Sequence, residues 1–133
     1  MHSVENLVLT EIAKAVRAEF ENADIASEYV RKPSQFPHIS IVESDNYMFT
    51  EGLDSSDTER YSTTVYEINV YSNKTSGKKA ECKKIMQIID SIMYRLNFVR
   101  TAMTPVPNLE DATIYRIIGR YTAVTDGTTV YRT

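Results

Sequence analysis

The stretch Tyr61-Ser-Thr-Thr-Val-Tyr-Glu-Ile-Asn-Val-Tyr71 alternates between two sets of side chains and is rich in β-branched and aromatic residues. This period of two predicts a half-buried strand. After a polar break at Ser72–Gly77, apolar residues from Lys78 to Leu96 recur every three or four positions, which predicts an amphipathic helix. Neither element can bury its apolar side alone, so the helix must pack on a sheet face. The apolar stripe of the helix consists of Cys82, Ile85, Met86, Ile89, Ile92, Met93 and Leu96.

The composition is that of a globular protein. A length of 133 residues with 42% apolar and 25% charged residues predicts one domain over residues 1–133, with a real core. The net charge of -3 gives no overall case for nucleic-acid binding. The single Cys82 cannot form an internal disulfide, and its place on the apolar stripe predicts a buried side chain rather than a reactive thiol. The sequence signals neither secretion nor membrane insertion.

The remaining pattern predicts one more helix and several strands, which gives an α+β domain. Both faces of the long strand expected at Asp111–Val124 are mixed, so the pattern leaves open which face meets the helices. Gly119 within it marks a bulge or a close approach. The expected elements are a helix at Val4–Ala23, strands at Ile25–Val30, Pro37–Val42, Asn97–Met103 and Asp111–Val124, and a return strand at Thr128–Arg132 after an Asp126-Gly127 hairpin.

Between the strands lies the most polar part of the chain, Glu43–Arg60, which holds six acids against one base. A connection of about 18 residues is long for a compact domain, and such loops are usually functional or disordered. Tyr47, Met48 and Phe49 either anchor this loop against a partner or belong to a solvated loop. The residues of this candidate interface are Glu43, Asp45, Tyr47, Phe49, Glu51, Asp54, Asp57 and Glu59.

Lysines crowd the start of the second helix, where cations oppose the helix dipole by a few tenths of a kcal/mol each. Two interpretations remain open, a solvated lysine face and a surface for an acidic partner or a phosphate backbone. Opposite charges on two parts of one small domain also suit head-to-tail association, which forms a ring when its rotation closes. The residues of this basic candidate interface are Lys74, Lys78, Lys79 and Lys83.

Little in the sequence supports catalysis. Only two histidines are present, and there is no Ser/His/Asp or Cys/His set. His38 follows a proline at a strand start, which predicts an exposed histidine, or one satisfied at a sheet edge, rather than a metal ligand or catalytic residue. We therefore expect no catalytic residues, no metal and no cofactor, and we expect that the protein is not an enzyme.

Several segments together resemble the tail-terminator proteins of long-tailed bacteriophages, also called tail-completion or minor capsid proteins. The likeness covers roughly residues 36–133 and lies in the order of elements and a handful of positions, not in one motif. The segments that carry it are Arg60–Asn73, Gly77–Ala80, Ile88–Asp90, Leu96–Phe98, Pro105–Pro107 and Tyr115–Tyr121.

The resemblance implies a mostly antiparallel sheet with two main helices packed on it. It also implies a structural virion protein that forms a ring, typically hexameric, on the head-proximal end of the tail tube. The ring would stop tube polymerisation and join the tail to the head connector. The implied partners are other copies of the chain, the tail tube protein, a head connector or head-closure protein, and genomic DNA that passes through without specific binding.

In this family a long loop before the central strand reaches toward the tube or the channel, and Glu43–Arg60 holds that position here. An acidic channel lining would repel DNA phosphates and let the genome slide. The implied location is the tail-neck region of the virion, after assembly in the cytoplasm of the bacterial host. The alternatives are another neck or tail component, such as a head-closure or tube protein, and an unrelated α+β binding module or small enzyme.

Overall fold

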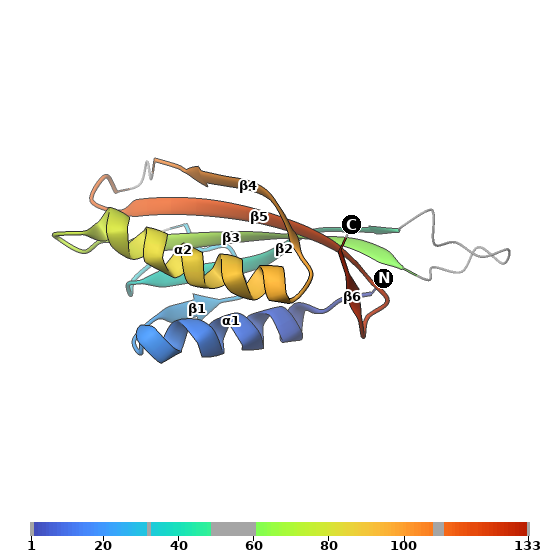
Figure 1. The fold of residues 1–133 in the computed structure, drawn as a ribbon. Coiled ribbons are helices and arrows are strands. Elements are labelled where there is room, and N and C mark those ends of the chain that lie inside the picture. Colours follow the sequence, from blue (N-terminus) through green and yellow to red (C-terminus); the bar gives the residue numbers. More distant parts are fainter. Residues whose placement is uncertain (1, 32, 49–60, 108–110, 133) are drawn as a thin grey trace, which may run out of the picture.

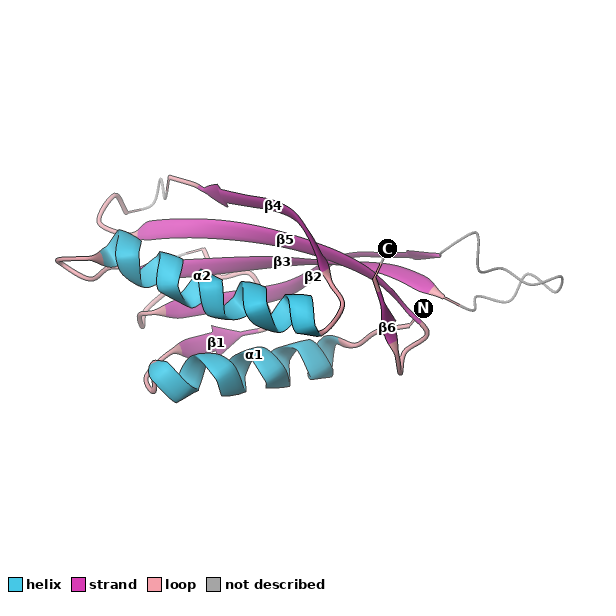
Figure 2. Ribbon diagram, in the orientation of Figure 1, coloured by secondary structure: helices cyan, strands magenta, loops and turns pink. Residues whose placement is uncertain are grey.

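The computed structural model describes residues 2–31, 33–48, 61–107 and 111–132, and it confirms the α+β class (Figure 1). Within these residues a six-stranded, mostly antiparallel sheet carries both helices on one face (Figure 2). The elements are α1 (Glu5–Glu19), β1 (Asp24–Ala26), β2 (His38–Met48), β3 (Ser62–Ser72), α2 (Lys78–Arg95), β4 (Val99–Pro105), β5 (Tyr115–Thr125) and β6 (Val130–Tyr131).

The strand predicted at residues 61–71 lies at the centre of the sheet as β3. The strand order is β1-β2-β3-β5-β4, and the short β6 pairs with β5. Only the β1–β2 pair is parallel, and β3 pairs with β5 from Ser62 to Ser72 without a break in register. The central position explains the strong alternation of β3, because both of its neighbours and the helical layer constrain it.

Strand β3 is more buried than the half-buried strand that the pattern predicted. The segment after β1 lies against the face of the sheet that the helices leave free. There the Tyr71 hydroxyl donates a hydrogen bond of 3.1 Å to the Val30 carbonyl, and the Ser40 hydroxyl donates one of 2.8 Å to the Glu28 carbonyl. Tyr71 is therefore fully buried although it faces away from the helices.

The core lies between the helices and the sheet, and it confirms the predicted stripe of α2, of which only Leu96 is partly exposed. Ile117 and Tyr121 of β5 belong to this core, which settles the face that the sequence left open. Gly119 lies between them, and a Cβ there would come within 2.6 Å of the Met86 methyl carbon. Because the β3–β5 register is regular at this point, Gly119 marks a close approach and not a bulge.

Several boundaries differ from the predicted ones. Strand β2 continues to Met48, six residues beyond the predicted end at Val42. A register shift between Glu43 and Asp45 breaks the alternation of its side chains, which hid the extension. At the other elements, α1 ends at Glu19 and not Ala23, β1 covers Asp24–Ala26 and not residues 25–30, and β5 begins at Tyr115 and not Asp111.

Asn97 ends α2 and is not the first residue of a strand, as the sequence indicated. Its φ of 69° is left-handed. The Asn97 N–H bonds the Tyr94 carbonyl at 3.0 Å, and the Phe98 N–H bonds the Met93 carbonyl at 2.9 Å. These are the two hydrogen bonds of a Schellman cap, and the buried Phe98 supplies its usual apolar contact.

We expect Asn97→Ala to lower the free energy of unfolding by about 1 to 2 kcal/mol, because alanine is strained at positive φ and the side-chain bond from Asn97 to the Val130 carbonyl is lost. Asn97→Gly should cost less, since glycine adopts this conformation freely. Urea unfolding of both variants tests this. Equal losses in the two would show that backbone conformation at Asn97 does not matter.

Candidate interaction surface

The acidic candidate interface begins on a strand and not in a loop. Glu43, Asp45 and Tyr47 lie on what we call the outer half of β2, Glu43–Met48, which pairs with β3 on one side only. Strand β1 ends at Ala26 opposite Ser40, so no described strand covers the other side of the outer half. Tyr47 and Met48 are 52% and 42% exposed, and Asp45 is exposed as well. The outer half of β2 is thus an open sheet edge with apolar and acidic side chains.

The Glu43 carboxylate is bound by side chains of its own chain. Its Oε1 accepts hydrogen bonds from the Thr64 hydroxyl at 2.9 Å and the Asn46 amide at 3.1 Å. The Ser3 hydroxyl lies 3.4 Å from the same oxygen. Glu43 therefore joins β2, β3 and the N-terminal segment, a structural task that the sequence did not reveal.

We expect Glu43→Ala to lower the free energy of unfolding by about 1 to 3 kcal/mol, because Thr64 and Asn46 lose their shared acceptor. Glu43→Gln keeps an acceptor oxygen of the same reach and should cost clearly less. Asp45→Ala is the control on the same strand, since the exposed Asp45 carboxylate accepts a bond from the N–H of the neighbouring Asn46 and not from another strand. Thermal or urea unfolding of the three variants measures the difference, and equal losses at positions 43 and 45 would contradict the structural role.

The rest of the acidic candidate interface cannot be placed. Phe49, Glu51, Asp54, Asp57 and Glu59 lie outside the described residues. The long acidic connection that the sequence predicted at Glu43–Arg60 is therefore shorter by six residues, because residues 43–48 belong to β2.

The four lysines of the basic candidate interface separate into different surroundings. The Lys78 ammonium donates a hydrogen bond of 3.1 Å to the Thr113 carbonyl and so ties α2 to the segment that leads into β5. Lys74 lies in the turn before α2. Lys79 and Lys83 lie one helical turn apart on the exposed side of α2, and neither forms an ion pair with the described residues. Only these two lysines are brought together at one site.

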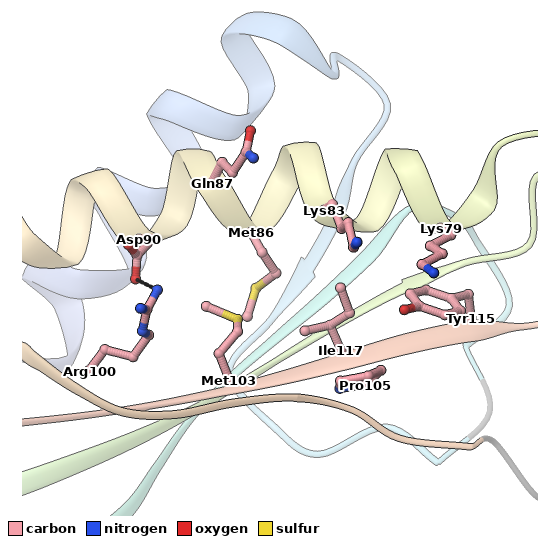
Figure 3. Close-up of a pocket in the computed structure, with 10 residues that line it drawn as sticks. All are labelled: Lys79, Lys83, Met86, Gln87, Asp90, Arg100, Met103, Pro105, Tyr115 and Ile117. Carbon is pink, nitrogen blue, oxygen red and sulfur yellow. Dashed lines mark hydrogen bonds and ion pairs between the residues drawn. The ribbon is translucent and has the colours of Figure 1, made fainter.

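That site is a groove of about 400 Å³ between α2 and β4, with β5 as its floor (Figure 3). Lys79 and Lys83 flank one end, and the side chains of Met86, Met103 and Ile117 meet in its middle. Sequence reasoning missed this groove, because the gap between α2 and β4 depends on how the two elements lie on the sheet, which the spacing of residues along the chain does not show. The residues that line it are Lys79, Lys83, Met86, Gln87, Asp90, Arg100, Met103, Pro105, Tyr115 and Ile117.

Asp90, the one acid among the described residues that line the groove, is neutralised by its neighbours. The Asp90 Oδ1 lies 3.2 Å from the Arg100 guanidinium and accepts a hydrogen bond of 3.0 Å from the Tyr121 hydroxyl (Figure 3 shows the ion pair). Burial, together with the Asp90 charge, raises the pKa of Tyr121. Among the described residues that line the groove, Lys79 and Lys83 are therefore the uncompensated charges, and this lining is basic with an apolar floor.

The described side chains that could act as a nucleophile or bind a metal ion lie in surroundings that do not favour either role. Cys82 is buried, its thiol points to the Val70 and Tyr115 carbonyls, and burial raises its pKa to about 12, which makes it a poor nucleophile. In the part of the chain that the structure describes, no three His, Cys, Asp or Glu side chains are grouped to hold a metal ion.

The prediction of an exposed His38 is wrong, because the ring is only 2% exposed. The alternative prediction, that the His38 ring is hydrogen-bonded at the edge of the sheet, is closer to the structure. His38 Nδ1 lies 2.9 Å from Asp24 Oδ2 of the edge strand β1, while Nε2 is buried without a partner among the described residues. The ring also lies beside that of Tyr71, with 5.7 Å between the ring centres, and a strand pattern alone does not show this contact.

Comparisons with protein-family models and with curated proteins find no match to this chain. Neither described helix combines the length and apolar character needed to cross a membrane.

Proposed function

We propose that this chain is a tail-terminator protein, a structural virion component that forms a ring on the head-proximal end of a phage tail tube. The ring stops tube polymerisation and joins the tail to the head connector in the neck of the particle. The observation that best supports the proposal is a sheet with open edges on opposite sides. Strand β4 forms one edge, and the outer half of β2 forms the other.

Two different open edges favour head-to-tail association over a symmetric dimer. Open edges readily add a strand from another chain, and natural monomers usually shield them. Strand β4 is exposed along most of its length and pairs only with β5. A contact between two different surfaces of identical subunits is heterologous, and such contacts form rings when the rotation closes.

The distribution of charge supports the same arrangement. The outer half of β2 leads into the acidic stretch of the sequence, whereas the β4 side of the molecule holds the uncompensated lysines of the groove. Opposite charges on the two edges favour attraction between the unlike edges and disfavour contacts between like edges.

The acidic stretch also suggests how DNA would pass through the ring. Carboxylates that line a channel repel phosphates, so that the genome slides without binding. Glu43 is not part of this lining, since its carboxylate is bound within the chain. Replacing Glu51, Asp54, Asp57 and Glu59 by the corresponding amides should leave ring assembly intact but slow DNA ejection from particles, and unchanged ejection would refute the channel role.

The proposed function is tested by multi-angle light scattering and electron microscopy, with the protein alone and with the cognate tail-tube protein. We expect a defined ring, or a monomer that caps tubes at a fixed length. Unlimited polymers would identify a tube subunit instead. A monomer that leaves tube length unchanged would overturn the proposal in favour of an unrelated binding module.

A further inference from the structure

We propose that the outer half of β2 of one copy docks into the groove between α2 and β4 of the next copy, with Tyr47 over the apolar floor and Asp45 beside Lys79 and Lys83. This contact would be the subunit interface of the ring, and it therefore rests on the proposed function.

The groove has the properties of a receptor for an apolar side chain with an acid nearby. Its volume of about 400 Å³ lies within the usual range of binding pockets, and Met86, Met103 and Ile117 give it an apolar floor. Methionine adapts its shape to what it contacts. Asp90 is already bound by Arg100 and Tyr121, so it does not repel an incoming carboxylate.

The outer half of β2 supplies the complementary chemistry. Tyr47 and Met48 are exposed large apolar side chains on this strand, and Asp45 lies two residues before Tyr47. Tyrosine and methionine are enriched in the cores of protein interfaces, where tyrosine buries its ring and keeps its hydroxyl hydrogen-bonded. The open backbone edge of the same segment can pair with β4, which borders the groove.

These two surfaces cannot meet within one copy. In Figure 1 the outer half of β2 extends to one end of the elongated molecule, whereas α2 begins at the opposite end. They also belong to opposite edges of the sheet. A contact between them must therefore join two copies, and because the surfaces differ, each copy can bind one neighbour on each side.

Site-specific crosslinking tests the contact directly. Two variants, Met48→Cys and Gln87→Cys, are mixed at millimolar concentration and treated with a short thiol-reactive bifunctional reagent. Native Cys82 is buried and should not react, which the wild-type protein checks. We expect a crosslink between the two different variants, distinguished by a mass tag on one of them. Crosslinks only between identical variants, or none at all, would overturn the proposed contact.

Charge reversal provides a second test of the same contact. Lys79→Glu with Lys83→Glu should weaken self-association about tenfold, and Asp45→Lys should weaken it in the same way, because each places like charges together. Combining all three changes in one chain should restore association. Lys14→Glu on α1 is the matched control, since Lys14 is an exposed lysine away from the groove. Failure of the combined variant to recover would contradict the pairing.

The outcomes separate this inference from the proposed function. If the charge-reversed variants still cap tubes and form rings like the wild type, the docking contact is wrong and the terminator function stands. If the crosslink forms as described but the wild-type protein does not affect tube length, the contact is real and the terminator function is wrong.

Discussion

Above about pH 9 the protein should lose folding stability steeply, because four buried acids keep their protons in the folded state. Burial raises the pKa of the Cys82 thiol from 9.0 to about 12 and that of the Tyr66 hydroxyl from 10.0 to about 12. Burial also raises the pKa values of Tyr71 and Tyr121 above 10.0. All four side chains are almost completely buried in the described part of the chain.

The sign follows from the number of protons bound in each state. Once the pH exceeds 9.0, the unfolded chain begins to lose the Cys82 proton while the folded chain retains it, and beyond 10.0 the three phenols follow. The unfolded state then binds fewer protons, so the free energy of unfolding falls as pH rises. Each group contributes about 1.4 kcal/mol per pH unit between its two pKa values, which makes the combined effect several kcal/mol.

Urea unfolding at a series of pH values from 8 to 11 measures this slope. We expect a loss of about 1 kcal/mol between pH 9 and 10, where Cys82 acts nearly alone, and a steeper loss above pH 10. Cys82→Ala should remove the first part of the slope and keep the second. A stability that stays constant up to pH 11, or a Cys82→Ala variant with the wild-type slope between pH 9 and 10, would contradict the expected burial of these groups.

The elements that the sequence predicted well are those with one regular set of apolar side chains in the core between sheet and helices. Strand β3 and helix α2 each place one periodic set of residues against the core, so the spacing of Tyr66, Ile68 and Val70, or of Cys82, Ile85 and Ile89, directly reports the buried side. The same physical rule placed Cys82 correctly. The α+β class then followed, because both kinds of element need a common core.

The outer half of β2 could not be predicted in this way. Its strand conformation comes from backbone pairing with β3, from Asp45 opposite Val65 to Met48 opposite Ser62. Its side chains are mostly exposed and the bulge after Glu43 shifts their alternation, so no apolar period marks the strand. Because this segment also opens the acidic stretch of the sequence, it was predicted to be part of a loop.

The groove was out of reach for a different reason. A second bulge, between Arg100 and Ala102, places Arg100 and Met103 together along the groove although an odd number of positions separates them. Tyr115 and Ile117 reach the same groove from β5, which precedes β4 in the sheet but follows it in the chain. Such an assembly depends on tertiary pairing. The sequence grouped Lys79 and Lys83 with Lys74 and Lys78 on one basic surface, but it could not show that only the first two line a groove.

The second large effect is expected at Tyr66, the fully buried tyrosine at the middle of β3. Its ring packs edge-on against Phe98 with 5.5 Å between the ring centres, and it lies opposite Glu43 of β2 and Tyr121 of β5. Tyr66→Ala should lower the free energy of unfolding by about 3 to 5 kcal/mol, because it leaves a large cavity between sheet and helices. For a domain stabilised by about 5 to 15 kcal/mol in total, this loss brings the protein close to unfolding.

Replacing only the hydroxyl separates packing from hydrogen bonding. By hydrogen-bond geometry the buried Tyr66 hydroxyl has no partner among the described residues, although the Ser3 and Thr64 hydroxyls lie close enough to oppose the rise of its pKa. Tyr66→Phe should therefore be close to neutral. The neighbouring Tyr121 is the matched control, since its hydroxyl donates to Asp90 and Tyr121→Phe should cost about 1 to 2 kcal/mol. Urea unfolding at neutral pH compares the variants. If Tyr66→Phe costs as much as Tyr121→Phe, the Tyr66 hydroxyl has a partner, and the centre of the sheet is more polar than its packing indicates.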